Sequence, residues 1–261
     1  MSIDHHAVTE GIKEIACRTL LPNFAAVVRE TKSDGSFVTE ADLSAQEQVA
    51  ALLYRLEPDI PMLGEEMSTE EQQQLLNAPL LWCLDPLDGT TNFSGGLPYF
   101  SISLALLGRG EAIFALVYDP VRDECFTAHK GKGAFLNGRL LILPEDEQPI
   151  SGAIGLIDFK RLPERFVTPL ALNPPYTSQR SLGSVALDWC WMAANRCQLY
   201  LHSRQKLWDF AAGLLIFSEA GGRHATLDGQ QLDYHHLESQ LAFAAVNDSL
   251  FKEWGDWLQN R

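Results

Sequence analysis

The segment Asp85-Pro86-Leu87-Asp88-Gly89-Thr90-Thr91-Asn92-Phe93 holds the residues whose types and spacing best support chemistry. Two carboxylates stand three residues apart with a backbone carbonyl between them, and oxygen donors of this kind suit hard divalent cations. Gly89, Thr90 and Thr91 follow in a turn that can open a helix, where free backbone N–H groups favour an anion such as phosphate. The local chemistry therefore indicates a metal ion together with a phosphate group.

A buried strand is expected immediately before this segment, because Trp82, Cys83 and Leu84 form a short apolar run. Such a strand would deliver Asp85 and Asp88 to the turn that follows. The strand and the turn together therefore predict a site in which the two acids have fixed positions.

Three other acidic positions have simple structural explanations when each is taken alone. Asp42 can close a capping box with Thr39 at the start of a helix, although Asp is shorter than the usual Glu or Gln. The pair Glu65-Glu66 fits a solvated loop, and Asp209 can interact with the dipole of the helix that it begins. A metal ion nearby would give these acids a functional explanation instead.

Periodicity predicts the elements that must position these residues. The expected helices are 3–20, 24–29, 40–56, 184–195, 209–220 and 250–258, and the expected strands are 82–84, 101–107, 113–118, 124–128, 153–157, 198–202 and 241–246. An Asn137-Gly138 turn suits a hairpin. Strands dominate the middle of the chain, and strands alternate with helices beyond it, which is typical of a layered α/β architecture.

The acidic, proline-containing stretch 143–149 is the best candidate for a boundary. We expect an N-terminal α+β half, residues 1–142, that carries most of the metal ligands. A C-terminal α/β half, residues 143–261, would carry Asp209 and the substrate pocket. No long flexible linker separates them, so the two halves should form one compact unit.

The composition is that of a globular protein, with 46% hydrophobic and 21% charged residues. A net charge of −14, with the Lys and Arg residues scattered singly, argues against a nucleic-acid or membrane partner. The five cysteines contain no Cys-x-x-Cys pair and are expected to be reduced thiols. The first residues do not resemble a signal peptide, and no apolar run approaches a membrane span of roughly 20 residues, so a cytoplasmic location is expected.

Three motifs, taken in order, resemble those of the inositol monophosphatase family. They are Gly64-Glu65-Glu66, the segment Asp85–Phe93, and Trp208-Asp209-Phe210-Ala211-Ala212-Gly213 followed by Glu219-Ala220-Gly221-Gly222. Gly-Glu-Glu alone is common, whereas the central segment combined with the distant Trp-Asp motif is specific. Weaker motif matches elsewhere extend the resemblance over nearly the whole chain.

The resemblance implies an α/β (α+β) fold, a layered α-β-α-β-α sandwich that is usually a homodimer. Members hydrolyse phosphate monoesters with two or three Mg²⁺ ions and are often inhibited by lithium. The family's catalytic residues match Asp42, Thr90 and Glu65, and its metal ligands match Glu65, Asp85, the Leu87 carbonyl, Asp88 and Asp209. Its substrate-binding positions match Asp88, Gly89, Thr90, Gly183, Ser184, Val185, His202 and Asp209.

These roles make chemical sense, because a phosphate monoester repels hydroxide until cations neutralise its charge. An ion held by Glu65, Asp85 and the Leu87 carbonyl would lower the pKa of its bound water, and another ion would stabilise the leaving oxygen. Thr90, hydrogen-bonded to Asp42, would orient the water in line with that oxygen. The expected substrate is a small phosphorylated metabolite of the inositol 1-phosphate type, that is, a polyol or sugar phosphate.

His202 departs from the family pattern. Relatives that cleave inositol phosphates commonly have a Glu at this position, seven residues before the Trp-Asp aspartate, which accepts hydrogen bonds from substrate hydroxyls. The segment Ala194–Gln198 also replaces the more usual Gly and Asp. The metal ligands are thus complete while the part that recognises the alcohol is altered, and a lone His on a strand is as consistent with a structural role as with a functional one.

Several alternatives stay open at the level of sequence. The substrate could be histidinol phosphate, a sugar phosphate or a 3′-phosphonucleotide, although Thr91-Asn92-Phe93 favours the inositol-type branch over the nucleotide branch. The chain could instead be a non-catalytic, metal-dependent regulatory relative, against which the complete set of acids argues. A purely structural dimer module would leave the clustered carboxylates unexplained.

Overall fold

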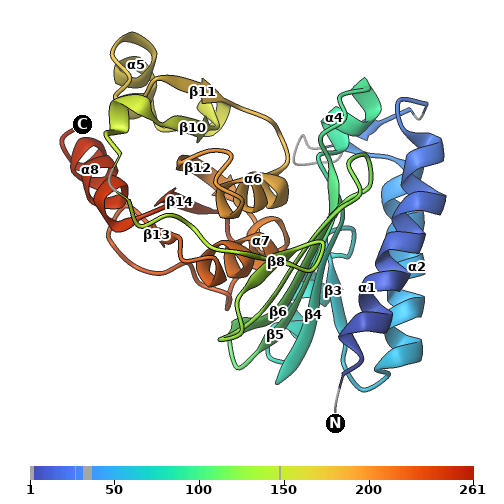
Figure 1. Ribbon diagram of the computed structural model, residues 1–261. Coiled ribbons are helices and arrows are strands. Elements are labelled where there is room, and N and C mark those ends of the chain that lie inside the picture. Colours follow the sequence, from blue (N-terminus) through green and yellow to red (C-terminus); the bar gives the residue numbers. More distant parts are fainter. Residues whose placement is uncertain (1–2, 27, 32–36, 147) are drawn as a thin grey trace.

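Two β-sheets organise the computed structural model, which describes residues 3–26, 28–31, 37–146 and 148–261 (Figure 1). The larger sheet has seven strands in the order β3-β4-β5-β6-β7-β8-β9. The strands are β3 (Met62–Gly64), β4 (Leu80–Asp88), β5 (Ser101–Gly108), β6 (Glu111–Asp119), β7 (Glu124–His129), β8 (Ala134–Leu136) and β9 (Arg139–Leu141). All neighbours are antiparallel except β3, which runs parallel to β4.

The smaller sheet has five strands in the order β11-β10-β12-β14-β13. They are β10 (Ile154–Ile157), β11 (Ser178–Arg180), β12 (Leu199–Gln205), β13 (Arg223–Ala225) and β14 (Gln240–Ala245). β10 is parallel to both β11 and β12, whereas β14 is antiparallel to both of its neighbours. A further short pair, β1 (Glu30–Thr31) and β2 (Phe37–Val38), stands apart from both sheets.

Helices cover both sheets and fill the space between them (Figure 1). They are α1 (His5–Ile15), α2 (Glu40–Leu56), α3 (Thr69–Leu75), α4 (Thr90–Gly95), α5 (Glu164–Leu172), α6 (Val185–Ala193), α7 (Leu207–Glu219) and α8 (Asp248–Gln259). α1 and α2 cover the outer face of the larger sheet, α6 and α7 lie between the sheets, and α5 and α8 lie on the far side of the smaller sheet. This order confirms the expected α-β-α-β-α sandwich.

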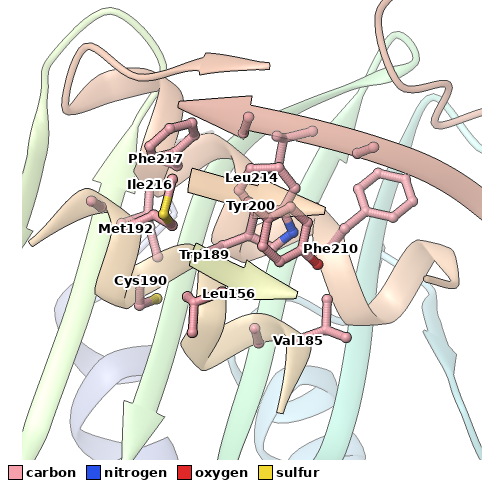
Figure 2. Packing of buried hydrophobic residues seen from close by; sticks show 14 of the residues in the cluster. Leu156, Val185, Trp189, Cys190, Met192, Tyr200, Phe210, Leu214, Ile216 and Phe217 are labelled. Carbon is pink, nitrogen blue, oxygen red and sulfur yellow. The ribbon is translucent and has the colours of Figure 1, made fainter. Parts of the chain in front are cut away.

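The central helices are apolar on nearly every side because a sheet covers each flank. Figure 2 shows Trp189 of α6 packed beside Tyr200 of β12 and near Phe217 of α7, with ring centroids 4.4 and 5.4 Å away. Their cluster of buried residues also includes side chains from the larger sheet, such as Val117. A second cluster joins the other face of that sheet to α1 and α2. These clusters fix the ends of β4, α6 and α7, which carry the candidate site.

Most expected elements are present, with one clear error. The helix predicted over Phe24–Arg29 is wrong in its described residues, because Phe24 leaves the helical conformation with ψ 127° and Ala25 has a φ of 60°. The ring of Phe24 packs near Phe93 and Phe100 instead, so tertiary contacts override the local helical pattern. The hairpin at Asn137-Gly138 is confirmed, with positive φ at both residues.

The larger sheet ends at Leu141 and the smaller sheet begins at Ile154. The change of sheet thus coincides with the stretch 143–149, while the division into halves 1–142 and 143–261 stays a prediction. All five cysteines are free thiols, of which Cys17 alone is exposed. No helix in the described part of the chain has the length and apolar character needed to cross a membrane.

Candidate active site

The carboxyl end of β4 presents the two acids of the central segment. β4 extends past the expected strand to Asp88, and its pairing with β5 shifts between Asp85 and Asp88, which is a β-bulge. The Leu87 N–H donates to Asp85 Oδ1 over 3.0 Å and so orients that carboxylate. Both acids are buried, with exposures of 2% and 8%. The bulge therefore brings two carboxylates and the Leu87 carbonyl together at one strand end.

Gly89 turns the chain sharply from β4 into α4. Its φ of +103° belongs to the region that favours glycine, and a Cβ there would lie 3.0 Å from the Tyr99 carbonyl oxygen. Thr90 is the first residue of α4, and its Oγ1 lies 3.0 Å from Asp42 Oδ1 and 3.1 Å from the Leu87 carbonyl oxygen. The predicted Thr90–Asp42 pair is thus a hydrogen-bonded pair in the structure.

Asp42 has the structural role and the contact with Thr90 at the same time. Its Oδ2 accepts from the Thr39 N–H over 2.8 Å and from the Thr39 hydroxyl over 2.5 Å, which completes the capping box of α2. Its Oδ1 remains for Thr90. Only 1% of Asp42 is exposed, and this burial raises the pKa of its carboxyl. The two explanations considered from the sequence therefore apply to different oxygens of one side chain.

Glu65 is held in place by its backbone rather than by a regular element. It follows β3, and its N–H donates to the Leu84 carbonyl over 3.1 Å. Gln72 of α3 donates to its carbonyl over 3.2 Å. A Cβ on the preceding Gly64 would lie 2.2 Å from Gln46 Oε1, so any other residue there would displace the Gln46 side chain. Gln46 and Gln72 were not identified from the sequence, because neither belongs to a motif.

Asp209 lies at the start of α7, at the carboxyl end of the smaller sheet's β12. The Lys206 N–H donates to its Oδ2 over 2.8 Å, so the carboxylate caps the helix as expected. The hydroxyl of Ser103 in β5 donates to the Trp208 carbonyl over 3.4 Å. This contact joins the start of α7 to the larger sheet.

The start of α6 holds Asp88. Ser184 is the N-cap residue of α6, and its hydroxyl donates to Asp88 Oδ2 over 2.7 Å, while the Ala186 N–H donates to the same oxygen over 2.6 Å. Val185 is buried beside them, and Gly183 is exposed with a φ of +84°. The structure therefore brings Ser184 and Val185, both predicted for the substrate pocket, to one of the predicted metal ligands.

Asn92 is a positioning residue that the sequence patterns did not reveal. From α4, its Nδ2 donates to the carbonyls of Tyr99 and Leu182 over 2.8 and 2.7 Å. Leu182 lies in the loop that enters α6. The start of α4, which contains Thr90, is consequently fixed to the start of α6, whose Ser184 and Ala186 donate hydrogen bonds to Asp88. Its position within the central segment was the only available signal.

Burial and repulsion between like charges raise the pKa values of Asp85, Asp88 and Asp209. Burial is the largest cause for Asp85, followed by the negative charges of Glu65, Asp88 and Asp209, and its pKa is well above the usual range. Burial and then the charges of Asp88 and Glu65 have the same effect on the pKa of Asp209. The pKa of Asp88 rises to about 6, because burial outweighs its hydrogen bonds from Ser184 and Ala186. We call Glu65, Asp85, Asp88 and Asp209 the acid cluster.

The acid cluster fits a divalent cation by its donor chemistry. Carboxylate and carbonyl oxygens are the ligands that Mg²⁺ and similar ions prefer, and a cation would offset the cost of several negative charges in a buried region. Within the described residues, no three Asp, Glu, His or Cys side chains converge tightly enough to form a finished coordination shell. Repulsion between carboxylates favours side-chain rotamers that keep them apart. The inference that the acid cluster suits a divalent cation therefore rests on its oxygen donors and on their position at the ends of β3 and β4 and the start of α7.

His202 has different partners from the acid cluster. Its Nε2 lies 3.2 Å from Asp158 Oδ2, and its Nδ1 accepts from the Arg204 N–H over 3.3 Å. Burial raises the pKa of Asp158, but the hydrogen bond and charge of His202 and the charge of Arg161 outweigh it and lower the pKa overall. Among described residues, no hydrogen bond or ion pair joins His202 to the acid cluster. His202 is buried in β12, with 5% exposure.

Comparison with known proteins agrees with this architecture. The sequence profile of the inositol monophosphatase family matches residues 2–253. The Nus factor SuhB of Pasteurella multocida is 36% identical over 203 residues, which covers 76% of this chain and 74% of that protein. The inositol-1-monophosphatase of Mesorhizobium japonicum is 35% identical over 211 residues and 77% and 76% of the two chains. The solved IMPase of Thermotoga maritima has a TM-score of 0.84 and 28% identity, covering 98% of this chain and 96% of its own.

Proposed function

Because the chain belongs to the inositol monophosphatase family, we propose that it is a magnesium-dependent phosphomonoesterase of small phosphorylated polyols or sugars. One observation carries the proposal. The hydrogen-bonded pair Thr90–Asp42 adjoins the Leu87 carbonyl, within the same turn as Asp85 and Asp88. A metal site alone would need the acids but would not need a partly buried hydroxyl–carboxylate pair next to them.

In this proposal the acid cluster and the Leu87 carbonyl hold two or three Mg²⁺ ions. When bound, such ions lower the pKa of a coordinated water molecule and stabilise negative charge on the oxygens of a phosphate ester. The residues of the chain supply position and charge. Ser184 and the Ala186 N–H keep Asp88 oriented, and the Lys206 N–H does the same for Asp209.

Thr90 and Asp42 orient the attacking water. When the Thr90 hydroxyl donates to Asp42, its lone pairs face away from Asp42 and can accept a hydrogen from a water molecule. The water then presents its own lone pair to the phosphorus, in line with the leaving oxygen. The backbone N–H groups of Gly89 and Thr90 bind the phosphate, and Gly183, Ser184, Val185 and His202 line the pocket for the alcohol. No residue becomes phosphorylated.

The same proposal includes a cytoplasmic homodimer without a nucleic-acid or membrane partner. A second candidate function is non-catalytic regulation, which is supported by the relatives named Nus factor, such as that of Pasteurella multocida. Both candidates allow metal binding, so turnover is the property that separates them.

A panel of phosphate monoesters assayed with and without Mg²⁺ tests the proposal. The panel contains inositol 1-phosphate, sugar phosphates, histidinol phosphate and a 3′-phosphonucleotide. We expect magnesium-dependent release of phosphate from at least one polyol or sugar phosphate. Absence of turnover on every member, with Mg²⁺ binding measured by calorimetry, would contradict the proposal and favour regulation.

A further inference from the structure

A basic edge lies next to the acid cluster, at the carboxyl ends of two parallel strands. β10 and β12 run parallel, with Ile157 opposite Leu201. The short helix η4 (Phe159–Arg161) follows β10, and the start of α7 with Asp209 follows β12. Segments that follow the carboxyl ends of neighbouring parallel strands lie at the same edge of a sheet, where α/β proteins commonly bind ligands. Arg161 and Asp209 therefore share one edge.

Contacts between the two segments fix this arrangement. The Asp158 N–H donates to the Leu201 carbonyl over 3.1 Å, and the Ser203 hydroxyl donates to the Arg161 carbonyl. Asp158 Oδ2 lies 3.2 Å from His202 Nε2 and 3.9 Å from Arg161 Nε. The guanidinium of Arg161 and the imidazole of His202 thus face the same carboxylate oxygen.

The guanidinium of Arg161 keeps its donors available. Its side chain is 43% exposed, and it donates no hydrogen bond to any residue in the described part of the chain, with Asp158 beyond hydrogen-bond distance. Its segment lies beside the one that follows β12 and leads to Asp209, as the Asp158 N–H bond to the Leu201 carbonyl shows. A guanidinium presents five N–H donors in a planar fork that matches a carboxylate or a phosphate.

The local charge of this edge is opposite to that of the protein. The whole chain carries 34 Asp and Glu against 20 Lys and Arg. The segment from Asp158 to Arg161 has two bases, Lys160 and Arg161, against one acid, and residues 202–209 contain Arg204 and Lys206 against Asp209. A locally positive edge on an acidic protein attracts anions to that place.

We propose that Arg161 binds a second anionic group of the substrate, a carboxylate or a further phosphate. The chain would then prefer phosphate monoesters whose leaving group is itself charged. This inference rests on the proposed function, in which the acid cluster and its cations take the phosphate that is cleaved. Arg161, with Lys160 and His202 beside it, recognises the other end of the molecule.

Matched pairs of substrates test this preference in the magnesium-loaded enzyme. Glycerol 2-phosphate and 2-phosphoglycerate differ by a carboxylate, and fructose 6-phosphate and fructose 1,6-bisphosphate differ by a phosphate. We expect kcat/KM for the more charged member of at least one pair to be about tenfold higher, mainly through KM, as for a charge-assisted hydrogen bond. The pair that shows the preference identifies the anion.

Variants assign the preference to one residue. Arg161→Gln should bring the ratio within the responsive pair close to one, and Arg161→Lys should restore part of it. Arg165→Gln is the matched control, because Arg165 is exposed on α5 with its guanidinium 4.7 Å from the centre of the Phe166 ring. It removes the same charge four residues away and should keep the ratio.

The outcomes also separate this inference from the proposed function. A kcat/KM ratio near one in the wild type, or a ratio that Arg161→Gln leaves unchanged, overturns the inference. Hydrolysis of the less charged member of each pair still supports the proposed function in that case. A ratio that falls equally in Arg165→Gln also overturns the inference, since a non-specific electrostatic effect of positive charge would then explain the preference. Absence of hydrolysis of every member with Mg²⁺ overturns both.

Discussion

The acid cluster and the basic edge are neighbours, yet they are built in opposite ways. The acids come from three separate strand or helix ends. Asp85 and Asp88 are buried, and like charges within the cluster raise the pKa values of Asp85, Asp88 and Asp209. The basic edge pairs opposite charges, and Arg161 remains 43% exposed. The first arrangement costs stability unless a cation is bound, whereas the second is tolerated by the protein alone.

This difference indicates which part of the site is set by the reaction and which by the substrate. A residue set that opposes folding is kept only for a chemical purpose, so the acid cluster should respond drastically to any change. The basic edge is close to neutral for folding and can vary between proteins of one family. Substitutions in the two regions should therefore differ in size and in kind.

The largest effect is expected for Asp88→Asn. Loss of one carboxylate from the acid cluster should lower magnesium-dependent kcat/KM by about 10³-fold or more, since charge neutralisation dominates phosphate ester hydrolysis. Asp209→Asn should behave similarly. Asp188→Asn is the matched control, because Asp188 is buried on α6 and accepts a hydrogen bond from the Tyr99 hydroxyl, which Asn can also accept. Steady-state assays on the best substrate measure all three.

A stability measurement accompanies this comparison. The pKa of Asp88 is raised to about 6 in the folded protein, above its value near 4 in the unfolded chain, so the ionised carboxylate opposes folding above pH 6. Without metal at pH 7, Asp88→Asn should therefore melt at or above the wild-type temperature. Activity close to wild type in a folded Asp88→Asn protein would remove this residue from the metal site.

Thr90→Val comes next in size. Valine keeps the shape of threonine but removes the hydroxyl that joins Asp42 to the site, and kcat should fall by about 10²-fold with little change in KM, as expected for a positioned water. Thr90→Ser retains a hydroxyl and should recover most of the rate. If Thr90→Val changed KM and left kcat intact, Thr90 would bind substrate rather than orient water.

His202→Glu should produce a smaller change, which affects substrate preference rather than the overall rate of hydrolysis. A carboxylate in place of the imidazole restores the hydroxyl acceptor of inositol-cleaving relatives and adds a negative charge beside Asp158. The kcat/KM ratio of inositol 1-phosphate to 2-phosphoglycerate should rise by roughly tenfold. His202→Gln, which adds no charge, serves as the control. Equal ratios in both variants and the wild type would assign His202 a structural role.

Asp158→Asn should have the smallest effect, measured as a change in stability. The pKa of Asp158 is lower in the folded protein than in the unfolded chain, so its carboxylate stabilises the fold above pH 4 and loses this contribution as the pH falls below about 4. At pH 7 the variant should lose about 1 kcal/mol or less of unfolding free energy. Urea unfolding at pH 7 and at pH 3 measures the change. A deficit that persisted at pH 3 would show that charge is not its cause.

Local patterns predicted the strand and turn that carry Asp85 and Asp88, whereas the five layers and the roles of Glu65 and Asp209 were predicted from the family resemblance. The apolar run at Trp82–Leu84 predicted a strand, and the spacing of Asp85 and Asp88 indicated a metal site. The patterns did not reveal Asn92, Gln46 or Arg161, whose roles depend on contacts across the fold and on strand ends that meet only after folding. The same tertiary effect explains the false helix at residues 24–29, where Phe24 packs on other aromatic rings.

The Thr90 hydroxyl has one hydrogen and two acceptors, Asp42 Oδ1 at 3.0 Å and the Leu87 carbonyl oxygen at 3.1 Å. Its hydrogen can satisfy only one of them at a time. In the proposed enzyme the Leu87 carbonyl would be a cation ligand, and the Thr90 hydrogen would then be left to Asp42, the arrangement in which Thr90 can orient water. By thermodynamic reciprocity, replacing Asp42 should weaken cation affinity although Asp42 is not a ligand. In the proposed enzyme, binding of the cation and orientation of the attacking water are therefore thermodynamically coupled.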